Sequence, residues 1–167
     1  CEPKWHFFDA KTRKSLKNAK ESGMGELLSH KLRDFKATEP FQEVMRDITK
    51  GYILNARTEW FLALGQSGIG KSMICSSICN QRLKEFHQVK YMIWNEFVDR
   101  LKRMNYDLDR DSYFDEYAKA EILYIDDLFK GKVTETDVNY AFRLINERYN
   151  KNLVTIVSSE LLLKDLR

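Results

Sequence analysis

The octapeptide Gly65-Gln66-Ser67-Gly68-Ile69-Gly70-Lys71-Ser72 matches the pattern G-x-x-x-x-G-K-[ST] at every fixed position. An apolar run precedes it over residues 60–64, and a pattern typical of a helix follows it over residues 71–87. In this context the glycines let the backbone wrap a phosphate group, and the new helix adds the positive end of its dipole. We therefore expect residues 65–73, Met73 included, to bind the phosphates of ATP or ADP.

The last two residues of the pattern have separate roles. In such loops the lysine, here Lys71, reaches the β- and γ-phosphates, and the hydroxyl of the next residue, here Ser72, is a ligand of Mg²⁺. A glycine-rich turn without this function would not require the Lys-Ser pair. The predicted cofactors are therefore ATP or ADP with Mg²⁺.

A second motif has the shape of a Walker B strand. The segment Leu123-Tyr124-Ile125-Asp126-Asp127 is an apolar strand that ends in two acids. We expect Asp126 to hold Mg²⁺ and Asp127 to orient the attacking water as a general base. The alternative is that two acids merely end a strand. Because Asp127 stands where a longer glutamate is usual, the predicted hydrolysis is slow and suits a switch.

Two serines follow the apolar run of residues 153–157. A polar side chain at the tip of this strand can touch the γ-phosphate or the attacking water, and we expect Ser159 or Ser158 to be this catalytic sensor. The alternative is that the serine only caps the next helix, since serine is a favoured N-cap residue.

Strand-like and helix-like patterns alternate from residue 60 to residue 157. This order predicts an α/β fold, a three-layer sandwich in which helices cover both faces of a parallel sheet. Residues 8–22 predict a basic helix, and Pro40 begins an amphipathic one. We expect two parts: residues 1–39, a basic helix and linker left from an N-terminal module, and residues 40–167, the catalytic core.

Composition excludes several classes of protein. Apolar residues make up 43% of the 167 residues and only 2 prolines and 7 glycines occur, so the chain is neither disordered nor fibrous. No apolar run approaches the roughly 18 residues of a membrane span, so no membrane partner is expected. Three cysteines do not form a disulfide framework, which indicates a cytoplasmic protein. We expect Cys75 and Cys79 to be core residues.

The net charge of +3 alone does not indicate a nucleic-acid partner, but its distribution is uneven. Five basic residues and no acidic one lie between residues 10 and 20: Lys11, Arg13, Lys14, Lys17 and Lys20. This stretch is either a solvated helix face or a contact to the phosphates of single-stranded DNA, which would be sensitive to salt. Aspartate occurs at every second position of residues 107–111, as in a calcium-binding loop, but the glycine and the glutamate of such a loop are absent. We expect this segment to be a solvated loop.

The motifs together resemble the AAA+ ATPases of the DnaC/IstB-like group, which load replicative helicases or assist transposases. The resemblance covers about residues 11–162, including a lead-in of Ser22-Gly23-Met24 and Glu39-Pro40-Phe41. It is carried by GQSGIGKS (65–72), ILYIDDL (122–128), INERY (145–149) and TIVSSE (155–160). Glu160 departs from the group, in which asparagine is common at this point, so the identity of the sensor residue stays open.

The resemblance implies a P-loop NTPase of the AAA+/RecA-like type with strand order 5-1-4-3-2. The fifth strand and a trans-acting arginine finger are expected beyond Arg167, which would leave the fragment nearly inactive. Phe35 is expected either near the adenine or in the core. The implied function is a phage-type helicase loader, with the replicative helicase, single-stranded DNA and further copies of itself as partners. A transposase helper ATPase and a P-loop nucleotide or small-molecule kinase are the alternatives, although no arginine-rich lid segment follows the third strand.

Overall fold

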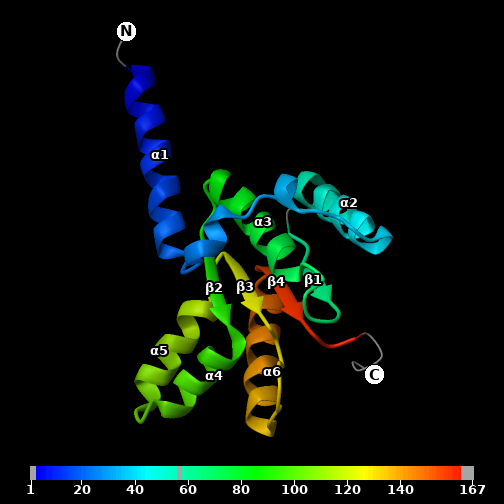
Figure 1. Ribbon diagram of the computed structural model, residues 1–167. Coiled ribbons are helices and arrows are strands. Elements are labelled where there is room, and N and C mark those ends of the chain that lie inside the picture. The colour runs from blue at the N-terminus through cyan, green and yellow to red at the C-terminus, as the bar shows by residue number, and fades with distance from the viewer. Residues whose placement is uncertain (1–2, 56–57, 163–167) are drawn as a thin grey trace.

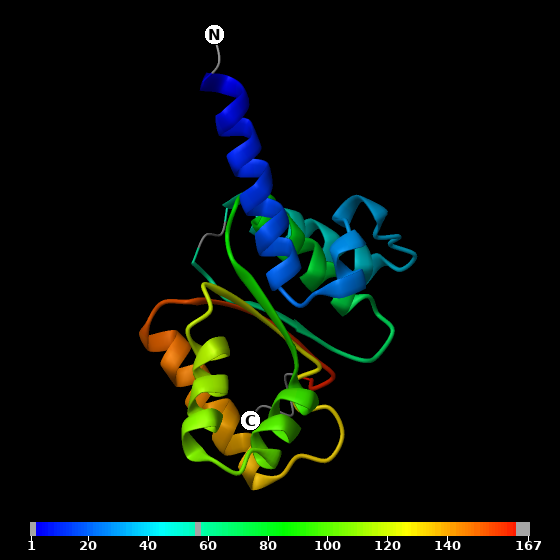
Figure 2. The same cartoon turned by 90° about the vertical axis from the view of Figure 1, so that its left-hand side faces the viewer.

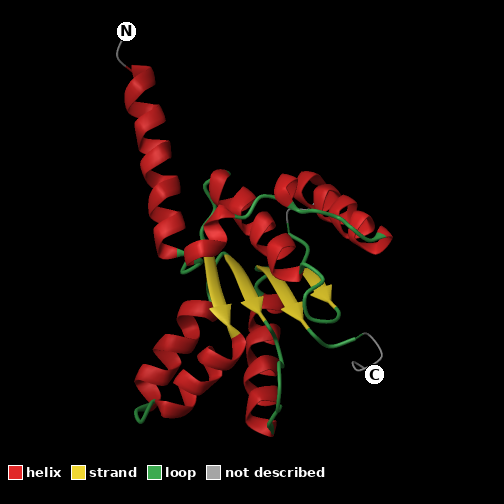
Figure 3. Ribbon diagram, in the orientation of Figure 1, coloured by secondary structure: helices red, strands yellow, loops and turns green. Residues whose placement is uncertain are grey.

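A parallel sheet with helices on both faces forms the body of the protein, seen in a computed structural model that describes residues 3–55 and 58–162 (Figures 1 and 3). The strands are β1 (Phe61–Leu64), β2 (Val89–Ile93), β3 (Ile122–Asp126) and β4 (Val154–Ser159). The helices are α1 (Pro3–Glu21), α2 (Pro40–Asn55), α3 (Lys71–Lys84), α4 (Trp94–Arg103), α5 (Asp107–Ala118) and α6 (Glu135–Asn150). Two short 3-10 helices, η1 (Gly25–Ser29) and η2 (Leu32–Asp34), lie between α1 and α2.

The strand order is β1-β4-β3-β2, and all neighbouring strands are parallel. This confirms the α/β sandwich and the 1-4-3-2 part of the expected order. The register pairs Leu64 with Ser159 and Ile93 with Asp126, so the carboxyl ends of all the strands meet at one edge of the sheet. In open α/β sheets, ligands bind outside this edge.

Two apolar cores lie between the helices and the sheet, one on each face of the sheet. Helix α3 lies on the same face as α1 and α2, while α4, α5 and α6 cover the other face (Figure 1). Cys75 and Cys79 lie on α3, are fully buried and belong to the core between α3 and the sheet, which confirms their predicted place. Helix α1 extends away from the body, so its basic residues lie largely in solvent (Figure 2).

The prediction of a solvated loop at residues 107–111 was wrong, because these residues form the first turns of α5. Aspartates in a first turn are favourable beside the positive end of the helix dipole. The rest of the helix buries Phe114 and packs the rings of Tyr113 and Tyr117 against Phe97. The acidic residues thus form the start of an amphipathic helix rather than a loop.

Candidate nucleotide-binding site

The phosphate loop joins β1 to α3 and is held in one conformation. Gly65, Gly68 and Gly70 have φ angles of 140°, 80° and 100°, which residues with a Cβ atom rarely adopt. A Cβ atom on Gly70 would lie 2.4 Å from Cε2 of Phe35. The Phe35 ring is therefore a buried core residue that packs against the loop at Gly70. Its contact with adenine stays a prediction.

Lys71 is the first residue of α3 and is buried, with 6% of its surface exposed. Its Nζ donates hydrogen bonds to the carbonyl oxygens of Gly65 and Gln66, both at 2.7 Å. The ammonium therefore lies inside the curve of the loop, at the start of a 14-residue helix. A cation and a helix N-terminus at one point fit the phosphates of a nucleotide.

Asp126 ends β3 beside the phosphate loop. The Ser72 hydroxyl lies 3.4 Å from its Oδ1, so the fold joins two motifs that are far apart in the sequence. Carboxylate and hydroxyl oxygens are ligands that Mg²⁺ accepts, and the two residues therefore fit the predicted metal. Among the residues that the structure describes, no group of three or more His, Cys, Asp or Glu side chains could hold a metal.

Three further hydroxyls hold the Asp126 carboxylate. Tyr124 donates to Oδ1 at 2.8 Å, Tyr91 donates to Oδ2 at 3.0 Å, and Ser158 donates to Oδ1. Burial raises the pKa of both phenols, which therefore remain donors. Neither tyrosine was predicted as a site residue. A signal was available for Tyr124, which shares a face with Asp126 by strand alternation. The role of Tyr91 depends on the register of the sheet, in which Tyr91 is the partner of Tyr124.

Asp127 follows in a left-handed conformation, with a φ of 55°. Its N–H donates to the Ser158 hydroxyl at 3.0 Å, and its Oδ2 accepts from Nζ of Lys130 at 2.8 Å. Nζ of Lys130 also lies 3.5 Å from Oε1 of Glu160. Lys130 was missed because the two acids that it joins lie on separate loops.

The two serines of β4 are used differently. Ser158 contacts Asp126 and Asp127, as described above. The Ser159 hydroxyl is buried, donates to the Leu128 carbonyl at 2.6 Å and accepts from the Leu161 N–H at 3.2 Å. Ser158 is therefore better placed than Ser159 for the sensor role, which stays a prediction for both.

A pocket of about 290 Å³ opens between the phosphate loop and the loop after β3. Its lining combines glycines, cations, hydroxyls and acids: Ser67, Gly68, Gly70, Lys71, Ser72, Met73, Asp127, Lys130 and Glu160. Gln66 and Ile69 belong to the same loop but do not line this pocket. The arrangement can hold a polyphosphate on one wall and a water beside a carboxylate on the other.

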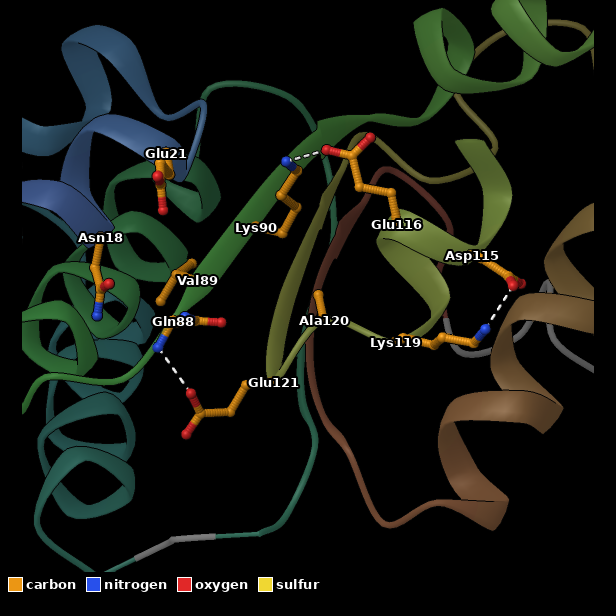
Figure 4. Close-up of a pocket in the computed structure, with 10 residues that line it drawn as sticks. All are labelled: Asn18, Glu21, Gln88, Val89, Lys90, Asp115, Glu116, Lys119, Ala120 and Glu121. Atoms are coloured by element: carbon orange, nitrogen blue, oxygen red, sulfur yellow. Dashed lines mark hydrogen bonds and ion pairs between the residues drawn. The ribbon is translucent and has the colours of Figure 1, made fainter. Parts of the chain in front are cut away.

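A larger pocket of about 470 Å³ lies between α1, β2 and α5 (Figure 4). It adjoins Val89 and Glu121, at the amino-terminal ends of β2 and β3, and so is at the opposite end of the sheet from the phosphate loop. Its lysines are already paired, Lys90 with Glu116 and Lys119 with Asp115 (Figure 4). It is therefore not the nucleotide site.

No helix in the described parts of the chain is long and apolar enough to cross a membrane.

Comparisons with known proteins agree with this geometry. The chain is 27% identical to the Bacillus subtilis protein YqaM over 130 residues, which cover 74% of this chain and 40% of YqaM. It is also 27% identical to an IS21-like insertion-sequence ATP-binding protein of Bacteroides fragilis, over 83% of this chain and 69% of that relative. The chain thus spans about two fifths of the length of YqaM.

A crystal structure of the DnaC helicase loader has the same fold, with a TM-score of 0.70 at 16% identity over 80% of this chain and 77% of that one. The profile of the family described as IstB-like ATP binding protein matches residues 11–165. All four strands of the described sheet and the phosphate loop lie within that match. The chain therefore belongs to the IstB-like ATP-binding proteins of the AAA+ class.

Proposed function

We propose that this protein is an ATP-binding and slowly hydrolysing loader of a replicative helicase, in which Mg-ATP controls the grip on the helicase and on single-stranded DNA. The observation that carries the proposal is the approach of Ser72 to Asp126, which sets the phosphate loop beside the Walker B acid. The fold shared with the DnaC helicase loader supports it. A domain division near Pro40, where α2 begins, is part of the same proposal.

The residues of the pocket divide the chemistry between them. The loop and Lys71 would hold the phosphates, and Ser72 and Asp126 would hold Mg²⁺, which neutralises charge on the phosphates when bound. Asp127 would orient the attacking water and accept its proton. Since a trans-acting arginine is expected to lie elsewhere, hydrolysis by a single copy is slow.

A transposase helper ATPase is the second candidate. The observation that favours it is the similarity to the IS21-like ATP-binding protein, which extends over 83% of this chain. The same nucleotide site would serve either function, so only the partner distinguishes them. A kinase is the weaker alternative, and phosphate transfer to a nucleoside monophosphate rather than release to water would reveal it.

Native mass spectrometry of the full-length protein tests the choice of partner. The protein is mixed in turn with the replicative helicase and with a transposase of its own host or phage, with ATP and Mg²⁺. A helicase complex that is lost in Lys71→Ala supports the loader, and its mass gives the number of self-associated copies. A complex with the transposase alone would contradict the loader and favour the helper.

A further inference from the structure

Lys130 lies on the wall of the nucleotide pocket that faces the phosphate loop. It stands four residues after Asp126, its side chain is 45% exposed, and it lines the same pocket as Gly68, Lys71 and Ser72. Among the described residues that line this pocket, Lys71 and Lys130 are the cations. The pocket therefore has a positive group on each wall.

The loop that carries Lys130 is fixed by its backbone. The Leu128 N–H donates to the Ser158 carbonyl at 2.9 Å, and the Leu128 carbonyl accepts from the Ser159 hydroxyl at 2.6 Å. The Asn95 side chain, at the start of α4, donates to the Lys130 carbonyl at 3.1 Å. Neighbouring strand and helix thus set the backbone position from which the lysine reaches into the pocket.

The same loop stores strain. Asp127 and Phe129 are left-handed, with φ angles of 55° and 59°, a conformation that residues other than glycine rarely adopt. The Phe129 ring packs edge-on against Trp94, with centroids 5.7 Å apart, which helps to hold this conformation. Backbone strain that the surroundings enforce is typical of functional sites. Here the strained turn brings Asp127 and Lys130 to the same wall.

The Lys130 ammonium is shared between two acids. Nζ lies 2.8 Å from Asp127 and 3.5 Å from Glu160, and the hydrogen bond with Asp127 raises the pKa of Lys130. These pairs are partly exposed, so water screens them and they hold the lysine weakly. A lysine is a point charge on a flexible stem of four carbons, which can exchange one anionic partner for another.

We propose that Lys130 is a second phosphate-binding cation of this site, and that its ammonium exchanges Asp127 and Glu160 for the terminal phosphate of ATP. This rests on the proposed ATPase function. ADP lacks the terminal phosphate, so Lys130 contributes to the binding of ATP and not to the binding of ADP. The exchange also frees the Asp127 carboxylate to take up the attacking water.

The hydrolytic step then balances within the site. The water oxygen bonds to the γ-phosphorus while the bond from that phosphorus to the oxygen of the β-phosphate breaks. Asp127 accepts the proton of the water and returns it to the inorganic phosphate. Lys130 stabilises the charge on the γ-phosphoryl oxygens, since hydrogen bonds between charged groups are about twice as strong as neutral ones.

Lys130→Gln in the full-length protein tests this role, with Lys132→Gln as the matched control. Lys132 is exposed, lies two residues away and does not line the pocket, and its replacement removes the same charge. Fluorescent ATP and ADP analogues give the two affinities, and phosphate release gives the turnover. In Lys130→Gln we expect ATP affinity to fall about tenfold, ADP affinity to stay within about twofold, and turnover to fall about tenfold. Lys132→Gln should match the wild type, and Lys130→Arg should restore part of the preference for ATP.

Two results would overturn the proposal. An unchanged ratio of ATP to ADP affinity in Lys130→Gln would show that the lysine does not touch the terminal phosphate. Faster turnover in Lys130→Gln would show that the lysine only restrains Asp127. If instead Lys71→Ala bound ATP as tightly as the wild type, the proposed nucleotide site itself would fail, and the role of Lys130 with it.

Discussion

Arg148 lies wholly inside the protein, on the inner side of α6. Its guanidinium donates hydrogen bonds to the carbonyl oxygens of Tyr117, Ala118, Ala120 and Val154 and to the Thr155 hydroxyl. Burial lowers its pKa to about 10, so it remains charged at neutral pH. One side chain thus satisfies the carbonyls at the end of α5 and joins them to β4.

We expect Arg148→Met to lower the free energy of unfolding by roughly 3 kcal/mol or more, because several buried carbonyls lose their donor at about 1–3 kcal/mol each. Urea denaturation measures the change. Arg143→Met is the control, since Arg143 is exposed and pairs with Asp111 on the surface, where such pairs contribute about 0–1 kcal/mol. Equal losses in the two variants would contradict the structural role of Arg148.

At the scale of single residues, the sequence predicted those whose role is local. Gly65, Lys71 and Ser72 lie in one continuous pattern, whose chemistry depends on the loop alone. Tyr91 and Lys130 could not be assigned in the same way, because their partners are set by strand register and by a strained turn. Sequence spacing does not show which side chains meet across a sheet.

Helix α6 begins with a capping box formed by Thr134 and Asp137. The Asp137 N–H donates to the Thr134 hydroxyl at 3.4 Å, and Oδ2 of Asp137 accepts from the Thr134 N–H at 2.7 Å. Lys102 of α4 donates to Oδ1 at 2.7 Å. Burial alone would raise the pKa of Asp137, but these bonds outweigh it and lower the pKa.

We expect Asp137→Ala to lower the free energy of unfolding by about 1 kcal/mol at pH 7. A carboxyl group whose pKa is lower in the folded state stabilises above its unfolded pKa, and this contribution is lost as the pH falls through the folded value. The difference between variant and wild type should therefore shrink below about pH 4. Urea denaturation at pH 7 and pH 3 measures it, with the exposed Glu135→Ala as control. A difference that is the same at both pH values would refute the ionic part of the cap.

The basic face of α1 is the proposed contact to single-stranded DNA. Charge reversal of Lys14 and Lys17 should weaken binding and flatten its dependence on salt, because fewer counterions are released. Fluorescence anisotropy over a range of salt concentrations measures both. Reversal of the exposed Lys36 and Lys50, outside α1, is the control. If the two double variants bind alike, the α1 lysines are only a solvated face.

Whole elements were predicted where periodicity and end signals agreed. Strands β1, β3 and β4 and helix α3 lie close to their expected ranges, and helix α2 begins at Pro40 as expected. Helix α5 was missed because its aspartates suggested a loop. Its apolar side is defined by the residues that pack on it, which include Phe97 of α4 and Tyr140 of α6. Packing between elements, rather than local preference, determines that segment.

For the whole molecule, the parallel sheet is what creates the site. Four strands end at one edge, and the segments after β1, β3 and β4 bring the phosphate loop, Asp127 with Lys130, and Glu160 around one pocket. The chain spans about two fifths of the length of YqaM. The pocket is formed by residues of this chain, so its binding of a nucleotide can be tested directly.

The most direct test is the equilibrium affinity of a fluorescent ATP analogue, in the presence of Mg²⁺, for the wild type, Lys71→Ala and Lys50→Ala. Lys71 lies inside the phosphate loop and Lys50 is exposed on α2. We predict saturable binding by the wild type and by Lys50→Ala, and a loss of about 100-fold or more in Lys71→Ala, since a buried charge-assisted contact to phosphate is removed. Binding of equal strength by Lys71→Ala, with its fold intact by circular dichroism, would contradict the assignment of the nucleotide site.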